Sequence, residues 1–262
     1  MSANSSNKQT PGLKESRFKR FPRIEKTILF CLLIVLGFGA ARALVVAGLL
    51  LLKLAGVSFA AMNESVFSSV VSVIIYALTL LIVIGLPWWV RNYQTTKKDI
   101  GLTRLLTWSD LGLAPAGFII YFLATAIVSF GVSKLIPGID LSQAQQTGFD
   151  HLSRYYEYVL AFVTLIVLAP IAEEVLFRGY LYGRLRRILP LWLAILITSA
   201  LFGFVHGQWN VGIDVFILSI VLCCLREVTG NIWAGILLHM MKNGLAFYLL
   251  FINPDILRTI GG

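Results

Sequence analysis

The fourth apolar stretch of the chain contains two adjacent glutamates, Glu173 and Glu174, and Arg178 follows four residues after Glu174. At this spacing Glu174 and Arg178 share one face of a helix and can form an ion pair. Two neighbouring carboxylates repel each other in a medium of low dielectric constant, and the arginine relieves this repulsion for Glu174. Glu173 lies about 100° further round the helix. We therefore assign a structural role to Glu174 and Arg178 and a chemical role to Glu173.

Two later apolar stretches each contain a histidine and a second residue four positions away. Phe202 precedes His206, and Asn243 follows His239. A helix rises about 1.5 Å per residue, so Glu173 and His206 both lie about 25 Å along their helices from the turn that joins them. His239 and Asn243 can reach the same level from the start of their own helix. We therefore expect Glu173, His206, His239 and Asn243 to meet in one site.

These side chains suit the hydrolysis of a peptide bond. Glu173 can take a proton from a water molecule as it attacks a carbonyl carbon, and His206 can hold that water. His239 and Asn243 can donate hydrogen bonds to the oxyanion, where one good donor contributes about 3–4 kcal/mol. Alternatively, Glu173, His206 and His239 bind a zinc ion whose bound water is the nucleophile. We favour the metal-free mechanism, with no cofactor, because Asn243 suits oxyanion binding and is a poor zinc ligand.

The helices that carry these residues are predicted to cross a membrane. Hydrophobic residues make up 58% of the chain and charged residues 13%, with a mean hydropathy of +0.82. A soluble domain carries about twice this charged fraction. The apolar residues occur in blocks long enough to cross a hydrocarbon core of about 30 Å. Basic residues lie at the ends of these blocks and do not alternate with aromatic ones, a pattern that excludes a nucleic-acid-binding surface.

The pattern predicts an all-α fold, a polytopic transmembrane helix bundle. We expect seven spans, at about residues 27–52, 67–90, 115–136, 156–178, 190–206, 211–225 and 231–252, with the fourth continuing as a polar-faced helix to Arg187. Residues 99–114 are expected to form an interfacial helix or loop on the membrane surface. Residues 206–210 are expected to be irregular backbone, which is tolerated at membrane depth only inside protein or beside a watery cavity.

The lysines and arginines of the predicted connections are distributed unevenly between the two sides of the membrane. Fifteen lie on the side of the N-terminus and four on the other side. Such an excess marks the cytosolic side, so the N-terminus is predicted to be cytosolic. We divide the chain into a basic cytosolic tail (1–26), three transmembrane helices with their loops (27–150), a catalytic helix bundle (151–253) and a short C-terminal tail (254–262).

The motifs of residues 173–178, 202–206 and 239–243 together resemble the CAAX protease and bacteriocin-processing family, relatives of the type II CAAX prenyl endopeptidase. That family's signature is similar to E-E-x-x-x-R, F-x-x-x-H and H-x-x-x-N/D on separate helices, and the resemblance covers about residues 156–251. The resemblance implies that Glu173 is the catalytic base and that His206 is its partner on the water. It implies that His239 and Asn243 donate to the oxyanion. Supporting roles fall to Glu174, Arg178 and Phe202.

The resemblance implies an intramembrane endopeptidase that acts on a membrane-associated peptide or protein in a bacterial plasma membrane. Many bacteria lack prenylated CAAX proteins, so the family name does not define the substrate. Similar proteins act in bacteriocin self-immunity or as membrane scaffolds, and for such a protein Glu173 would be dispensable. A transporter also buries charges, but it predicts repeated halves with interrupted helices, which the sequence does not show.

Overall fold

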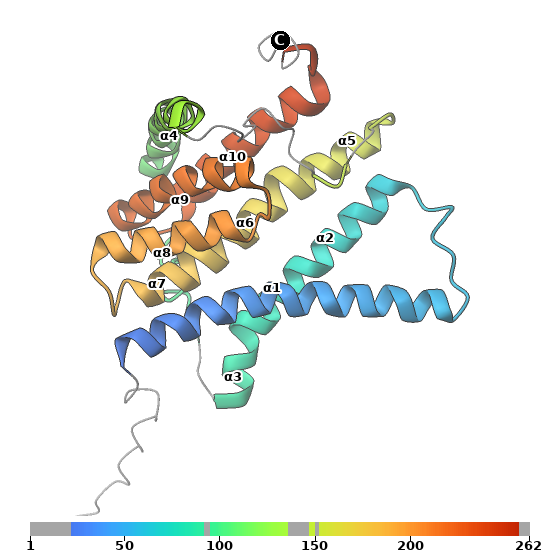
Figure 1. Cartoon of the computed structure of the whole chain (residues 1–262), viewed down its shortest axis with the longest axis horizontal. Helices are drawn as coiled ribbons and strands as arrows, with labels where there is room; N and C mark the ends of the chain where they lie inside the picture. Colours follow the sequence, from blue (N-terminus) through green and yellow to red (C-terminus); the bar gives the residue numbers. More distant parts are fainter. Residues whose placement is uncertain (1–21, 92–94, 136–146, 150–151, 257–262) are drawn as a thin grey trace, which may run out of the picture.

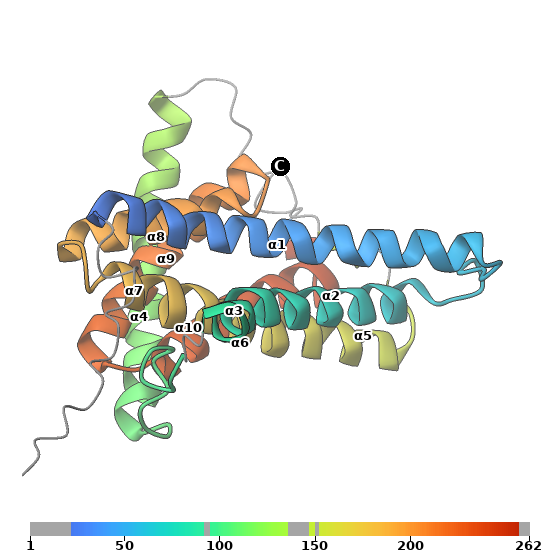
Figure 2. The same cartoon turned by 90° about the horizontal axis from the view of Figure 1, so that it is seen from below.

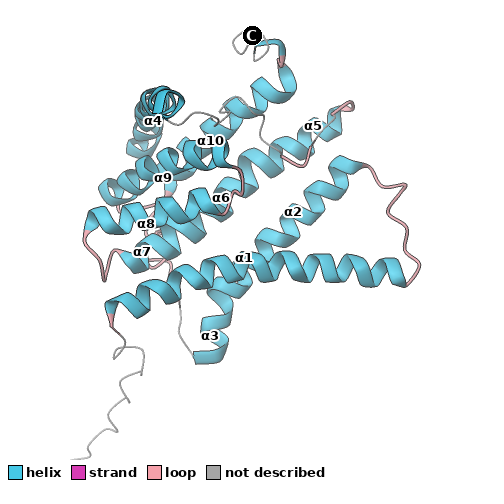
Figure 3. Cartoon of the chain, viewed as in Figure 1, coloured by secondary structure: helices cyan, strands magenta, loops and turns pink. Residues whose placement is uncertain are grey.

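The computed structural model of the chain describes residues 22–91, 95–135, 147–149 and 152–256. All regular structure within them is helical, which confirms the predicted all-α class (Figure 3). Most of the predicted N-terminal tail, residues 1–21, and the end of the predicted C-terminal tail, residues 257–262, lie outside the described residues. The first helix begins at Arg23, within the predicted tail.

The described helices form seven continuous stretches, and each predicted span falls on one of them. The bounds are α1 (Arg23–Leu54); α2 (Glu64–Leu80), a π-helical turn (Leu81–Gly85) and α3 (Leu86–Arg91); α4 (Trp108–Leu135); α5 (Tyr155–Phe162), a π-helical segment (Val163–Leu168), α6 (Ala169–Glu174), a second π-helical segment (Val175–Leu181) and α7 (Tyr182–Leu185); α8 (Leu191–Phe204); α9 (Trp209–Thr229); and α10 (Trp233–Phe247) with a π-helical end (Tyr248–Ile252).

Five of these stretches are long and apolar enough to cross a membrane. They are Arg23–Leu54, Glu64–Gly85, Trp108–Leu135, Tyr155–Leu185 and Trp233–Ile252, all within the described part of the chain. The helix α8 is apolar but has 14 residues, about 21 Å of helix, which is shorter than the hydrocarbon core. The chain is therefore a membrane protein with several spanning helices. Of the seven predicted spans, five correspond to helices long and apolar enough to cross a membrane.

The outward-facing side chains of the long helices are apolar, as expected for surfaces in contact with lipid. On α1, Leu44 and Leu51 are more than half exposed, and on α4 the same is true of Ile119 and Phe130. In water such surfaces would be costly, whereas lipid tails are as apolar as these side chains.

The continuous stretch from α5 to α7 runs through the middle of the protein. The helices α1 and α2 pack along one side of it, and α8, α9 and α10 along the other (Figure 1). The helix α4 packs on α9 and α10 and crosses the others: it is seen nearly end-on in Figure 1 and lengthwise in Figure 2. The bundle is therefore not a set of near-parallel spans, because an apolar run predicts burial in lipid but does not fix a crossing angle.

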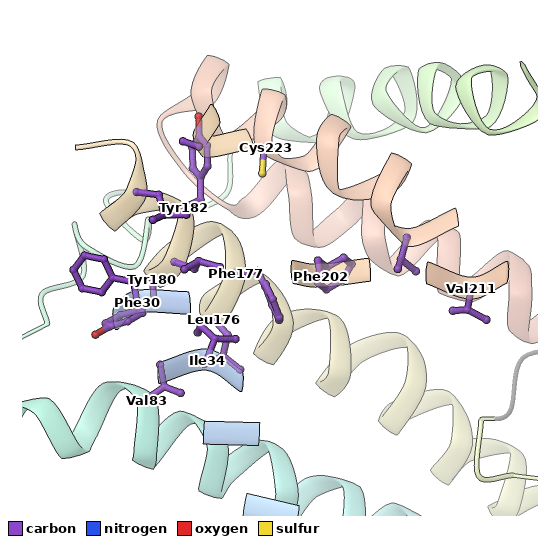
Figure 4. Close-up of a cluster of buried hydrophobic side chains, with 14 residues drawn as sticks. Phe30, Ile34, Val83, Leu176, Phe177, Tyr180, Tyr182, Phe202, Val211 and Cys223 are labelled. Atoms are coloured by element: carbon purple, nitrogen blue, oxygen red, sulfur yellow. The ribbon is translucent and has the colours of Figure 1, made fainter. Parts of the chain in front are cut away.

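The main hydrophobic core surrounds the middle stretch. Phe177 from this stretch packs with Ile34 of α1 and Phe202 of α8 (Figure 4). The helices α8 and α9 approach each other at Gly203 and Gly212: a Cβ on Gly203 would lie 2.7 Å from the Gly212 carbonyl oxygen. Small residues at such a crossing allow two backbones to pack closely, which is a common way of holding helices together in a membrane. This crossing fixes the end of α8, where His206 follows.

Residues 99–114, expected to be an interfacial helix or loop, are divided between a loop and the start of α4. Residues 95–107 form a loop, and α4 begins at Trp108 instead of about residue 115. The start of α4 is set by Asp110, which accepts a hydrogen bond from the backbone N–H of Thr107 at 2.9 Å and forms an ion pair with Arg104. Asp110 thus supplies a hydrogen-bond acceptor and a negative charge at the N-terminus of the helix, where both are stabilising. The helix therefore begins before its apolar part.

The 95–107 loop packs against the ends of the middle stretch and of α10. Asp99 forms an ion pair with Arg187 at 2.6 Å, and the Ile232 backbone N–H donates to the Gly101 carbonyl at 3.1 Å. The 95–107 loop, the turn at Arg187 and the link before α10 therefore meet at one end of the protein. The distribution of lysines and arginines had placed all three on the same side of the membrane.

Candidate active site

The two glutamates lie on α6, a single turn and a half of α-helix between two π-helical segments. Pro170, in the first turn of α6, has no backbone N–H to donate, so the regular hydrogen-bond pattern is interrupted before it. Such π-helical insertions occur frequently at functional sites because they free backbone carbonyls and re-aim side chains. Both glutamates therefore lie in a short α-helical segment with a π-helical segment on each side.

Glu174 and Arg178 form the ion pair expected from their spacing. The Arg178 Nη1 donates to Glu174 Oε1 at 2.9 Å, and both side chains are 0% exposed. The same carboxylate oxygen lies 3.1 Å from Nδ1 of His239, on α10. Glu174 has room for this contact because Gly235 faces it: a Cβ at Gly235 would lie 3.0 Å from Glu174 Oε2. Glu174 thus joins Arg178 to His239, a second contact that the helix-face argument did not predict.

Phe202 connects the arginine to both histidines. The guanidinium carbon of Arg178 lies 4.2 Å from the centre of the Phe202 ring, a cation–π arrangement. The rings of His206 and His239 meet the same phenylalanine edge-on, with centroid distances of 4.8 Å and 5.9 Å. Phe202 is fully buried. Both histidines therefore pack against one buried ring.

Glu173 faces a different set of groups from Glu174. The hydroxyl of Tyr76, on α2, donates to Glu173 Oε1 at 2.5 Å. The other oxygen, Oε2, lies 3.7 Å from Nε2 of His239. The Glu173 side chain remains 12% exposed. The two adjacent glutamates thus occupy distinct environments: Glu174 is sealed in an ion pair, and Glu173 is accessible beside a histidine.

His206 lies in the short link between α8 and α9. This link, residues 205–208, is not helical, and Gly207 within it has a φ of +72°, which favours glycine. The irregular backbone predicted at 206–210 is therefore present at 205–208, while Trp209 and Asn210 already belong to α9. The His206 Nδ1 lies 2.7 Å from the Phe202 carbonyl oxygen. Because a carbonyl only accepts, Nδ1 carries the proton, and a neutral His206 offers Nε2 as an acceptor.

Asn243 follows one turn after His239 on α10. Its Nδ2 donates to the carbonyl oxygen of Leu165 at 2.8 Å. Leu165 lies in the π-helical segment Val163–Leu168, where carbonyls are available for such contacts. This hydrogen bond of Asn243 thus anchors α10 to the middle stretch.

The alternative metal set consists of Glu173, His206 and His239. All three lie within the described residues, where no group of three or more His, Cys, Asp or Glu side chains has the spacing of a metal site. Nε2 of His239 lies 3.7 Å from Glu173 Oε2, which is beyond hydrogen-bond distance, and its Nδ1 lies 3.1 Å from Glu174 Oε1.

Sequence reasoning missed two groups near the site. The first is Tyr76, one of several hydroxyl-bearing residues in the predicted second span, which nothing in the sequence distinguishes from the serines and the threonine beside it. The second is a polar cluster on three helices: Lys242 Nζ lies 3.2 Å from Asp214 Oδ2, and the Tyr121 hydroxyl donates to Asp214 Oδ1 at 2.5 Å. Lys242 and Asp214 had no assigned role, and the structure pairs them with each other.

Comparison with known proteins identifies the segment that carries the site. Residues 155–245 match the model of the family described as "Type II CAAX prenyl endopeptidase Rce1-like". An Escherichia coli protein named "Uncharacterized 24.3 kDa protein" is 34% identical over 89 residues, 32% of this chain and 41% of that protein. "Putative membrane peptidase YdiL" of Bacillus subtilis (strain 168) is 29% identical over 154 residues, 58% of each chain. No solved structure matches the chain.

The chain thus spans less than two thirds of either relative. The matched segment begins at the first residue of α5 and contains both glutamates and both histidines of the site. Residues 155–245, which carry the site, are therefore similar to the Rce1-like type II CAAX prenyl endopeptidase family.

Proposed function

We propose that the protein is an intramembrane endopeptidase in which Glu173 activates a water molecule to hydrolyse a peptide bond near or within the membrane. The observation that carries this proposal is the asymmetry of the glutamate pair. Glu174 is sealed in an ion pair with Arg178, whereas Glu173 is partly exposed, 3.7 Å from His239. A general base must be accessible to water and within reach of the reacting groups.

The reaction begins with a water molecule held between Glu173 Oε2 and Nε2 of His206. Glu173 takes a proton from this water, and the oxygen attacks the carbonyl carbon of the peptide bond. The bond to nitrogen then breaks, and the proton held by Glu173 passes to the leaving amine. In this scheme one proton moves through one carboxyl group, so no further base is needed.

His239 and Asn243 stabilise the oxyanion that forms during the attack. Because Nδ1 of His239 faces the Glu174 carboxylate, this nitrogen carries a proton. In the proposed mechanism Nε2 of His239, on the Glu173 side of the ring, donates to the oxyanion. The side-chain amide of Asn243 provides the second donor. Oriented donors of this kind supply a large part of the rate enhancement in acyl transfer.

The proposed orientation places the N-terminus in the cytosol. The 95–107 loop and the Arg184–Arg187 turn lie at one end of the protein, joined by the ion pair of Asp99 with Arg187. The excess of basic residues in these connections supports a cytosolic position for that end. The substrate class is a membrane-associated peptide or protein, and the named relatives support a bacterial plasma membrane as the location.

The test is a pair of variants, Glu173→Gln and His206→Ala, compared with the control Glu227→Gln at the far end of α9. Membrane proteomes of cells that express each variant are compared for a peptide that accumulates when Glu173 is lost. Cleavage of that peptide by purified protein should fall at least about 100-fold in Glu173→Gln, because a general base contributes about that much or more. If cleavage and the cellular phenotype survive both site variants, the chain is a non-proteolytic scaffold or immunity protein.

A further inference from the structure

The site contains one contact from outside the matched segment. Tyr76 lies on α2, before the matched residues 155–245, and its hydroxyl donates to Glu173 Oε1 at 2.5 Å. In a membrane interior a tyrosine hydroxyl needs a partner, and a carboxylate is the strongest acceptor a side chain can offer. The contact therefore joins the N-terminal helices to the residue proposed as the base.

Helix α2 is fixed beside the middle stretch by a second polar contact. Its N-cap residue, Asn63, accepts from the Val66 backbone N–H and donates to Glu157 Oε1 at 2.7 Å. Glu157 in turn accepts from the backbone N–H groups of Ser153 and Arg154 at the start of α5. The starts of α2 and α5 are thus tied together, and the two helices run in parallel from there (Figure 1).

The distance along each helix explains how Tyr76 comes to lie at Glu173. From the contact at Asn63 to Tyr76 there are 13 residues (76 minus 63), and from Glu157 to Glu173 there are 16 (173 minus 157). The longer stretch includes the π-helical segment Val163–Leu168, which interrupts the regular α-helix between these two contacts. The ring of Tyr76 also packs edge-on against Phe38 of α1, at 6.4 Å between centroids. Both ends of the tyrosine side chain are therefore held.

This arrangement determines which oxygen of Glu173 is available. With Oε1 bound to the tyrosine, Oε2 faces Nε2 of His239. Without that donor the carboxyl group could turn about its side-chain bonds and present either oxygen. We propose that Tyr76 is a positioning residue that holds Glu173 in its reactive orientation, an inference that rests on the proposed function of Glu173. The active site then extends beyond the matched segment to α2.

The experiment compares Tyr76→Phe with Tyr182→Phe. The control removes a contact of the same kind, since the Tyr182 hydroxyl donates to Glu227 Oε2 at 2.7 Å away from the site. Phenylalanine keeps the ring contact with Phe38, so the fold is retained. Full-length protein in lipid nanodiscs is studied by infrared difference spectroscopy, in which the wild type minus Glu173→Gln isolates the carboxylate band of Glu173.

We expect the Glu173 carboxylate band to shift in the Tyr76→Phe background and to keep its frequency in the Tyr182→Phe background. With the peptide found by the proteome comparison, kcat should fall about tenfold in Tyr76→Phe, the value of one hydrogen bond to a charged group, while KM changes little. An unchanged band, or equal effects of the two variants on kcat, overturns the role of Tyr76.

The infrared measurement needs no substrate, so it separates the two proposals. If Glu173→Gln still cleaves the peptide, the proposed function itself is wrong, whatever the band does. If Glu173→Gln is inactive and Tyr76→Phe retains the wild-type kcat and band, the function stands and Tyr76 has no part in positioning the base.

Discussion

The buried ion pair of Glu174 and Arg178 leads to an asymmetric stability prediction. Arg178 has Glu174 as its ion-pair partner and the face of Phe202 beside it, and an arginine does not lose its proton in a protein. Glu174 has a further partner in His239 at 3.1 Å. Replacing Glu174 by Gln therefore strands a buried cation, whereas replacing Arg178 by Met leaves a carboxylate that His239 still compensates.

The magnitude follows from the burial of the pair. Both side chains are 0% exposed, and removing one partner of such a pair costs roughly 3–5 kcal/mol. For a chain of this size about 1 kcal/mol corresponds to about 2–4 °C, so Glu174→Gln should lower Tm by about 10 °C. Arg178→Met should lower it by less. The double variant, which buries no charge at either position, should be more stable than Glu174→Gln alone.

The assay is thermal unfolding of the purified protein in one detergent, followed by circular dichroism at one heating rate. Arg186→Met is the control, because its ion pair with Glu227 is exposed and such pairs contribute little. The reasoning is refuted if Arg178→Met is the more damaging single change. It is also refuted if the double variant is as unstable as the sum of the two single changes.

Three further predictions concern the rest of the chain. Gly179→Ala should lower Tm, because the new Cβ would collide with the Ile100 carbonyl oxygen, whereas Gly112→Ala, with nothing within 4 Å, should not. Although burial opposes it, hydrogen bonds from its own loop and from Arg187 hold the pKa of Asp99 below its ordinary 3.8. The stability it contributes is present above that value and lost as pH falls through the lowered pKa, so the Tm difference between wild type and Asp99→Asn should vanish on acidification. Chelation by EDTA should leave peptide cleavage unchanged; a loss that zinc restores would contradict the metal-free mechanism.

Much of the fold could be predicted because apolar blocks of spanning length carry a strong signal. All seven predicted spans coincide with helical stretches. The start of α4 was missed because it depends on hydrogen bonds of Asp110 with Thr107 and not on hydropathy. The crossing of α4 over the other helices could not be predicted either, since it is set by side-chain packing between residues far apart in the sequence.

In the candidate site, contacts within one helix could be predicted from the sequence and contacts between helices could not. Pairs four residues apart on one helix, such as Glu174 with Arg178, follow from helical geometry alone. Contacts between helices do not: neither the approach of His239 to Glu174 nor that of Tyr76 to Glu173 has a signature in the spacing of the chain. A hydroxyl in the second span does not single out Tyr76, because the span also contains serines and a threonine, and it does not identify a partner.

The pairing of charges around the site bears on which carboxylate can act as the base. Glu174 is neutralised by Arg178, and the Asp214–Lys242 pair is closed at 3.2 Å. Within the described part of the chain no arginine or lysine lies within ion-pair distance of Glu173, which faces a phenol and a histidine. A proton taken up by Glu173 therefore disturbs neither ion pair. In the proposed reaction the negative charge passes from this carboxylate to the oxyanion that His239 and Asn243 are proposed to stabilise, so the net charge of the site does not change during the step.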